Sequence, residues 1–249
     1  MTLYNPGNLP KNDNLNRFAF VIDVHDEMFI RKGKMIAYYG QMKFESVGSG
    51  LLDILVKEAF NAPLHVHNFV VVTGNGQLIL GDNGNDVACY DIDDANLTVR
   101  ASNLLGFSKK VTCRESIMPG FLTLLGTGKV IAASNGPVHF LEPPCRVDPQ
   151  AILGWADCPC PAVRYDYHHV TNTLNAIGAY MGITLSGEEQ QIEFTGKGNV
   201  LIQSSEMALH GNPTLAQMLL QIPSLGTTEL GSLNSAISRE IAAQQRSNR

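Results

Sequence analysis

The sequence predicts an all-β protein, a double-stranded β-helix or β-sandwich with internal hairpin duplication and a short helical C-terminal segment. One pattern, an apolar run, a Gly-x-Gly and a second apolar run, occurs at Phe69–Leu80, Phe121–Ser134 and Gln191–Ser205. Because glycine accepts positive φ without a Cβ penalty, each Gly-x-Gly is predicted to be the turn of a hairpin. The copies are unevenly spaced, which excludes a regular solenoid. Short strands between Gly and Pro turns favour a sandwich or jelly-roll barrel.

Composition narrows the class of protein. The chain has 249 residues, of which 44% are hydrophobic and 16% charged, enough for one large β domain or two small ones. The net charge of −5 provides no broad basic surface, so nucleic-acid binding is not favoured, although a local basic rim stays open. No apolar run approaches the ~20 residues that span a bilayer, and the polar N-terminus lacks a signal core. We expect a cytoplasmic protein. Its odd number of cysteines argues against a complete disulfide framework.

The first part of the chain divides into an arm and several strands. Residues 1–17 are predicted to be an irregular arm, and a β body is expected over residues 18–206. Phe18–Val24 is expected to be the first strand, and Met35–Tyr39 the next, after a turn at Gly33. Gln41–Gly50 is expected to be a flexible connection. Leu51–Phe60 has helical spacing but is short and ambiguous.

The later elements follow the same logic. Further strands are expected at 88–91, 96–101, 108–114, 138–141, 147–155 and 162–167. The stretch 171–181 reads as either strand or helix. Residues 207–249 form the predicted helical segment, with apolar residues at helical spacing in 214–222 and 233–245.

His65 and His67 give the most suggestive metal signal. Two histidines at a spacing of two on a strand lie on one face and could share a metal. Cupins use such a pair together with a carboxylate four or five residues on. Val71 and Val72 stand there, so the third ligand is missing, and His139 could supply it only through a tertiary contact. A metal site therefore stays an alternative, and packed histidines are favoured.

Other motifs favour structure over chemistry. The loop Cys158-Pro159-Cys160 lacks the Cys-x-x-Cys spacing of redox and zinc sites, and a rigid loop is favoured. None of the Gly-x-Gly sites has the third glycine and following helix of a dinucleotide fingerprint. His168-His169 reads as a strand edge, and the acidic turn Asp91, Asp93, Asp94 as a solvated turn. No nucleophile elbow is present, and the basic residues near Tyr38 and Tyr39 give only a thin base-stacking signal. No catalytic residue, metal or cofactor is predicted.

The order of the glycine motifs resembles one family. FTGKGNVLIQSS (Phe194–Ser205) resembles the signature hairpin of the family called Altered Inheritance of Mitochondria number twenty-four, with the pattern Phe-x-Gly-x-Gly-x-Val-x-x-Gln-Ser/Thr. Leu124–Leu141 resembles the family's preceding hairpin, and Arg31–Phe44 its early glycine-led strand. The likeness covers most of Phe18–Glu206. Each motif alone is turn glycine plus strand, so the specificity comes from their order.

The resemblance implies a bacterial-type member with a fold like that of the tryptophan RNA-binding attenuator protein. It also implies a homo-oligomer, for which a trimer is expected, and offers no established catalytic residues to carry over. Mitochondrial members are linked to inner-membrane organisation, but this role is not transferred because no targeting segment is found. The leading expectation is a non-enzymatic oligomeric scaffold or binding protein whose partner is itself. Two alternatives stay open: a cupin-like metal-dependent enzyme using His65 and His67, and RNA or small-ligand binding in an attenuator-like assembly.

Overall fold

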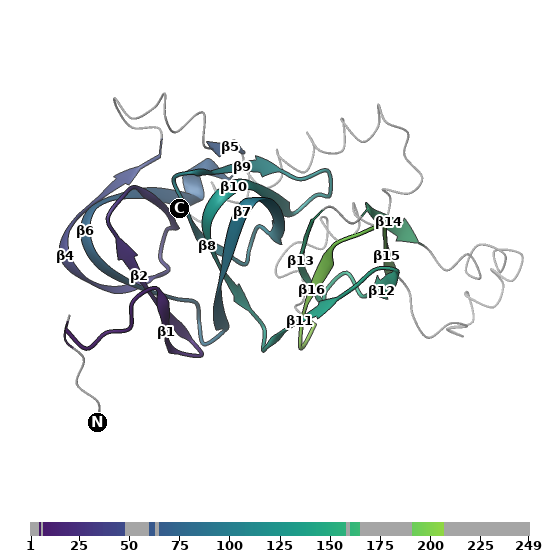
Figure 1. Cartoon of the computed structure of the whole chain (residues 1–249), viewed down its shortest axis with the longest axis horizontal. Helices are drawn as coiled ribbons and strands as arrows, with labels where there is room; N and C mark the ends of the chain where they lie inside the picture. The colour runs from purple at the N-terminus through teal and green to yellow at the C-terminus, as the bar shows by residue number, and fades with distance from the viewer. Residues whose placement is uncertain are drawn as a thin grey trace, which may run out of the picture.

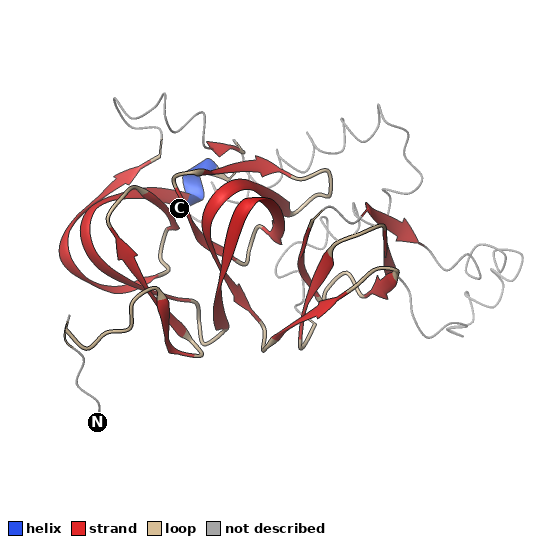
Figure 2. Ribbon diagram, in the orientation of Figure 1, coloured by secondary structure: helices blue, strands red, loops and turns tan. Residues whose placement is uncertain are grey.

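The computed structural model describes residues 5, 7–47, 60–62, 65–157, 160–164 and 191–206. Within these residues the protein is nearly all β, as predicted, and its single helix is the 3-10 turn η1 (Val66–Asn68) (Figure 2). Thirteen strands form one sheet and three form a second. The double-stranded β-helix stays a prediction, and the helical segment expected at 207–249 lies outside the described residues.

The strands differ greatly in length. Their bounds are β1 (Asp13–Asn16), β2 (Ala19–Val24), β3 (Met28–Arg31), β4 (Met35–Ser46), β5 (Phe60–Asn61), β6 (Phe69–Gly81), β7 (Asp86–Arg100), β8 (Leu104–Ser108), β9 (Val111–Glu115), β10 (Phe121–Ser134), β11 (Val138–Leu141), β12 (Cys145–Val147), β13 (Ile152–Ala156), β14 (Cys160–Arg164), β15 (Gln191–Thr195) and β16 (Asn199–Gln203). Neighbouring strands are antiparallel, apart from the short parallel pair of β5 and β9.

The prediction that the Gly-x-Gly sites are hairpin turns is wrong. Gly74–Gly76 lies inside β6, and Gly126–Gly128 lies inside β10, and both strands run on through these residues. At the third site, residues 196–198 separate β15 from β16, but these strands belong to different sheets and do not pair with each other. The glycines therefore mark bends in strands that keep their direction, as the curved β4 and β6 show (Figure 1).

Glycine is required at these bends because two backbones approach closely. Gly74 has φ +126°, and a Cβ built on it would overlap the carbonyl oxygen of Gln41 in β4. A Cβ on Gly76 would overlap the carbonyl oxygen of Tyr39 in the same way. Since β4 has its own positive-φ residue here, Gly40, both strands of the pair bend at one level.

Several predicted boundaries also change. Residues 41–46, expected to be a flexible connection, continue strand β4. The two short strands expected at 88–91 and 96–101 are one strand, β7, with Asp94 at φ 44° near the register shift opposite Gly126–Gly128. β1 lies within residues 1–17, where no strand was expected, and pairs with β2.

The strand pairing repeats three times. Each unit contains a long antiparallel ladder: β4 with β6, β7 with β10, and β13–β14 with β15–β16. In each unit the second strand of this ladder also pairs, along its opposite edge, with two short strands. β6 pairs with β2 and β3, β10 pairs with β8 and β9, and β15–β16 pair with β12 and β11. The Gly-x-Gly bend always lies where this edge changes from one short strand to the other. We call these groups unit 1, unit 2 and unit 3.

The units join edge to edge in two different ways. Units 1 and 2 meet through short strands, where Phe29 of β3 lies opposite Phe107 of β8. Units 2 and 3 meet where the five-residue β13 pairs with the long β7, with Gly154 opposite Val99. A Cβ on Gly154 would overlap the carbonyl oxygen of Thr98, so this junction too depends on a close backbone approach.

Apolar side chains cross the same junctions. The rings of Phe29 and Phe107 stack with centroids 4.8 Å apart, and Phe69 lies 5.9 Å from Phe107. The largest core cluster combines residues of all three units, and a separate cluster around Trp155 and Phe194 fills unit 3. Because the buried surface is shared between units, we expect them to unfold together.

A buried arginine links units 2 and 3. The Arg100 side chain donates hydrogen bonds to the carbonyl oxygens of Pro149 (2.5 Å) and Ile152 (2.7 and 3.1 Å), and its guanidinium lies 5.1 Å from the Phe121 ring centroid. Burial lowers the pKa of Arg100 to about 10, while Asp148 acts in the opposite direction. The carbonyl groups compensate the loss of hydration and hold the β12–β13 connection against β7.

Replacing a bend glycine should destabilise the fold far more than replacing a turn glycine. We expect Gly74→Ala to lower the free energy of unfolding by about 3 kcal/mol or more, because it combines an unfavourable φ with backbone overlap. Gly84→Ala is the matched control, since Gly84 has φ +76° but no atom near its Cβ position. Its cost should be about 1 kcal/mol. Urea unfolding followed by circular dichroism measures both, and equal costs would contradict the close-approach argument.

Candidate interaction surfaces

Strand β4 exposes an unusual amount of apolar surface. Ten of its twelve residues are exposed, and Tyr39 and Met42 are half-buried. We define the β4 surface as its four exposed large apolar side chains: Met35, Ile36, Tyr38 and Phe44. Ile36 is 60% exposed, and the rings of Tyr38 and Phe44 contact each other edge to face at 5.3 Å. Since Gly40 lies between these two rings, the bend brings them together.

The pairing of β4 leaves one of its edges open. β4 pairs with β6 along its length, and no other strand in the described ranges pairs with it. Figure 1 shows β4 on the outside of the molecule, beyond β6. A long exposed edge with apolar side chains is a template for pairing with another chain, which proteins normally avoid.

A second candidate is a groove of about 410 Å³ between units. Its floor is the first half of β7, from Val87 to Tyr90, and the turn between β1 and β2 forms one wall. The other wall comes from the end of β10 and from β11, including Phe140, which is 59% exposed. We call this feature the β7 groove.

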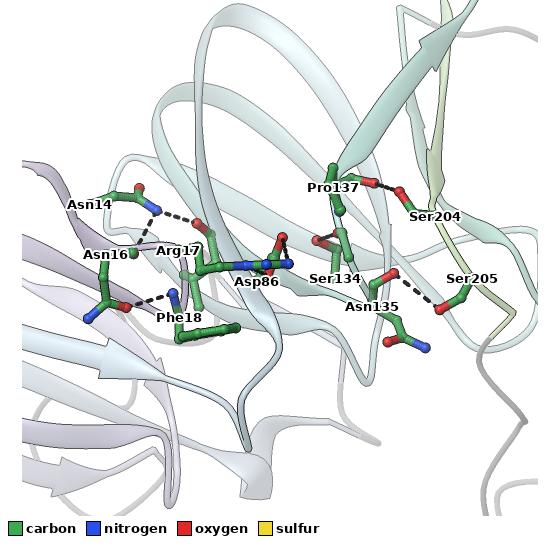
Figure 3. A network of polar contacts seen from close by, with 12 residues as sticks. Asn14, Asn16, Arg17, Phe18, Asp86, Ser134, Asn135, Pro137, Ser204 and Ser205 are labelled. Atoms are coloured by element: carbon green, nitrogen blue, oxygen red, sulfur yellow. Dashed lines mark hydrogen bonds and ion pairs between the residues drawn. The ribbon is translucent and has the colours of Figure 1, made fainter.

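Polar contacts fix both walls of the β7 groove (Figure 3). Arg17 donates two hydrogen bonds to the carboxylate of Asp86, at 2.9 and 3.1 Å, and the Asn14 amide donates to the carbonyl oxygen of Val87 at 2.8 Å. On the other side, the Ser204 hydroxyl donates to the carbonyl oxygen of Pro137 at 2.6 Å. The walls are thus held by β1–β2 and by the end of β16.

The floor of the groove carries two protonated groups. Burial raises the pKa of the Cys89 thiol to about 11, so it is neutral at pH 7 and a poor nucleophile. Burial also raises the pKa of Tyr90, whose hydroxyl is buried and has no hydrogen-bond partner among the described residues. The floor of the groove is therefore uncharged at neutral pH.

The histidine pair does not have the geometry assumed for a metal site. Val66 and His67 belong to the 3-10 turn η1, and His65 is its N-cap, so the assumption of a strand is wrong. His65 is half-buried and His67 is exposed. No group of three or more His, Cys, Asp or Glu residues in the described part of the chain could hold a metal ion.

The other residues singled out in the sequence do not come together in one site. His139 accepts or donates a hydrogen bond with Ser204 at 3.2 Å, and Asp91 forms an ion pair with Lys129 at 2.6 Å. Burial, with a contribution from Glu115, raises the pKa of Cys113 to about 12. Cys158, Pro159, His168 and His169 lie outside the described residues.

The basic cluster near Tyr38 and Tyr39 is also dispersed. Arg31 donates to the carbonyl oxygen of Ala101, and Lys34 forms an ion pair with Asp82. Neither cation therefore extends over the β4 aromatic rings as a base-stacking site requires.

The β4 surface was not predicted, although the sequence holds a signal for it. A strand with one buried face alternates apolar and polar residues, but MIAYYGQMKF has apolar residues at both parities. Such a run is typical of a strand buried on both faces, and this strand is exposed.

Comparison with known proteins identifies relatives of the whole β body. The model of a family described as mitochondrial biogenesis AIM24 matches residues 18–205. The crystal structure of protein SPYM3_0169 from Streptococcus pyogenes is similar, with a TM-score of 0.56 and 14% identity, over 86% of this chain and 97% of that one. At this identity the likeness concerns the fold alone. No curated protein matches significantly, and no helix in the described residues is long and apolar enough to cross a membrane.

Stability should depend on pH through His65. Burial, together with nearby Arg31, lowers the pKa of His65 to about 4. Because the unfolded imidazole titrates near pH 6.5, the unfolded chain binds the additional proton between these values. The free energy of unfolding should therefore fall as pH decreases from about 6.5 to 4, by up to about 3 kcal/mol.

Urea unfolding at a series of pH values measures this dependence. In His65→Gln the contribution should disappear, whereas the exposed His67→Gln should keep it. An unchanged pH profile in His65→Gln would contradict the assignment.

Proposed function

The chain belongs to the mitochondrial biogenesis AIM24 family, and we propose that it is a non-enzymatic, homo-oligomeric scaffold or binding protein. One observation carries the proposal: the β4 surface is apolar and exposed on a strand whose outer edge has no partner among the described strands. The attenuator-like fold implied by the resemblance stays a prediction, and the subunit number of the assembly decides whether the trimer it implies is correct.

The β4 surface supports association because leaving it in water is costly. Fully burying a large apolar side chain contributes about 1.5–3 kcal/mol before ordering costs are subtracted. The four side chains of the β4 surface are 37–60% exposed, so each gains a part of that amount. Strand pairing adds hydrogen bonds for the backbone groups of the open edge. The exposed side chains include two aromatic rings, a residue type enriched at protein interfaces.

A non-enzymatic role is supported by the chemistry of the described groups. The thiols of the half-buried Cys89 and the buried Cys113 are protonated at neutral pH, so neither side chain is in its nucleophilic thiolate form. At η1, His65 is half-buried and His67 is exposed. No pair of these groups forms the hydrogen-bonded nucleophile and base that covalent catalysis needs.

RNA binding ranks lower because five of the basic side chains in the described residues are held in ion pairs. Five ion pairs bring together Arg17 and Asp86, Lys34 and Asp82, Lys109 and Glu27, Lys129 and Asp91, and Arg146 and Glu193. Phosphate binding requires cations that are available to the backbone of the nucleic acid.

Binding of a small apolar ligand is a second candidate, and the β7 groove favours it. The groove has an apolar wall at Phe140 and Val138, and its walls are fixed by hydrogen bonds. Its volume of about 410 Å³ lies within the usual range of ligand sites, about 300–1,000 Å³.

The scaffold proposal predicts a β4-dependent assembly. Native mass spectrometry and light scattering should give a multiple of the 27.1 kDa chain mass for the wild-type protein. The double variant Ile36→Lys/Phe44→Lys should be monomeric, because two desolvated charges at each contact cost several kcal/mol. Ile117→Lys is the control, since Ile117 is 89% exposed but lies on the β9–β10 connection, away from β4. A wild-type monomer, or equal effects of both changes, would overturn the proposal.

The ligand candidate predicts additional mass bound to each subunit. Gentle native mass spectrometry should then show a mass above 27.1 kDa per chain that denaturation removes. Phe140→Ser should lower the bound fraction several-fold, since it removes the exposed ring from the groove wall. Retention of the same mass in Phe140→Ser would place the ligand elsewhere.

A further inference from the structure

We infer that β4 pairs antiparallel with β4 of a second copy of this chain, around a two-fold axis at Gly40. The inference rests on the proposed oligomeric function and specifies its contact. Three features of β4 lead to it: the type of edge that is open, the order of its side chains and the position of its bend.

Unit 2 has an edge of the same type as the open edge of β4, and there it is paired. β7 occupies in unit 2 the place that β4 occupies in unit 1, since each pairs along its length with the bent strand of its unit. The outer edge of β7 is covered over Leu97–Val99 by β13, a five-residue strand of unit 3 that runs antiparallel to it. The β4 edge has no such partner within the described residues, and a second copy offers one of the same length and curvature.

The order of side chains in β4 matches its own reverse. With the axis at Gly40, Tyr38 lies opposite Met42 of the second copy, and Ile36, at the bulge between Met35 and Ala37, lies near Phe44. Directly opposed residues in an antiparallel pair lie on the same face, so apolar side chains meet apolar side chains. Each of these contacts occurs twice, as two-fold symmetry requires.

The bend and the charges agree with the same register. Gly40 of one copy would lie opposite Gly40 of the other, so both strands curve at the same level. Lys43 would lie opposite Ala37, and Glu45 would lie near Met35 beyond the bulge, so no like charges meet. An axis at Lys43 would instead place two ammonium groups opposite each other, which is unfavourable.

A second copy fits this surface better than an unrelated partner. The apolar residues occupy positions on both sides of Gly40, and the one acidic and one basic side chain of the strand each face an uncharged residue. A two-fold contact also produces dimers or other even-numbered assemblies, so a trimer would contradict it.

Cysteine cross-linking tests the register. Ala37→Cys and Lys43→Cys are two separate variants at exposed positions, made in the otherwise unchanged protein. In the proposed pair these positions lie opposite each other, within the Cα separation that a disulfide spans. Position 37 lies far from position 37 of the other copy, as does 43 from 43. Mixing the two variants under mild oxidation should therefore yield about tenfold more cross-linked dimer than either variant alone.

Peptide mapping by mass spectrometry should identify the disulfide between positions 37 and 43, with wild-type protein reporting links made by native cysteines. As a second readout, hydrogen exchange of β4 amides should slow as protein concentration rises.

The outcomes separate this inference from the proposed function. An oligomeric wild-type protein without a 37–43 cross-link and without concentration-dependent protection of β4 overturns the β4 pair but leaves the scaffold in place. Cross-linking of each variant with itself, as efficient as in the mixture, overturns the register. A wild-type chain that stays at 27.1 kDa over the concentration range overturns both.

Discussion

The close approach of two backbones at the strand bends is the constraint on which the structure depends. At the β4–β6 bend, Gly40, Gly74 and Gly76 leave no room for a Cβ because each lies against a carbonyl oxygen of the facing strand. The bend allows one long strand to pair with two different short strands along a single edge. Without it, β6 could not contact both β2 and β3, and the core shared between units 1 and 2 would lose one side.

These strand bends explain why the β content could be predicted from the sequence, whereas the ends and pairing of the individual strands could not. Apolar runs separated by glycine correctly indicated that the described part of the chain is nearly all β, and Gly33 is the turn expected before β4. A local sequence does not reveal whether a glycine with positive φ reverses the chain or bends it. That choice depends on the backbone that faces the glycine, which comes from distant residues: Gln41 of β4 for Gly74, and Lys110 of the β8–β9 turn for Gly126.

The candidate surfaces were less predictable than the fold. His65 and His67 stood out because two histidines at a spacing of two would share a face of a strand, but a 3-10 turn places them differently. The β7 groove combines the β1–β2 turn, β7 and β11, which only tertiary structure brings together. The β4 surface was visible as a run of apolar residues, yet its exposure depends on which edges the other units occupy.

The alternation of junctions gives the series of units two unequal ends. One end is the twelve-residue β4, and the other is formed by the four-residue β11 and the three-residue β12. Head-to-tail growth would have to join a long edge to much shorter ones and would leave most of β4 without a partner. Association of like ends satisfies the long edge fully and presents only short strands to further copies. In the assembly proposed through β4, the described strands would therefore favour closed assemblies over fibres, because none of their other edges offers a matching end for growth.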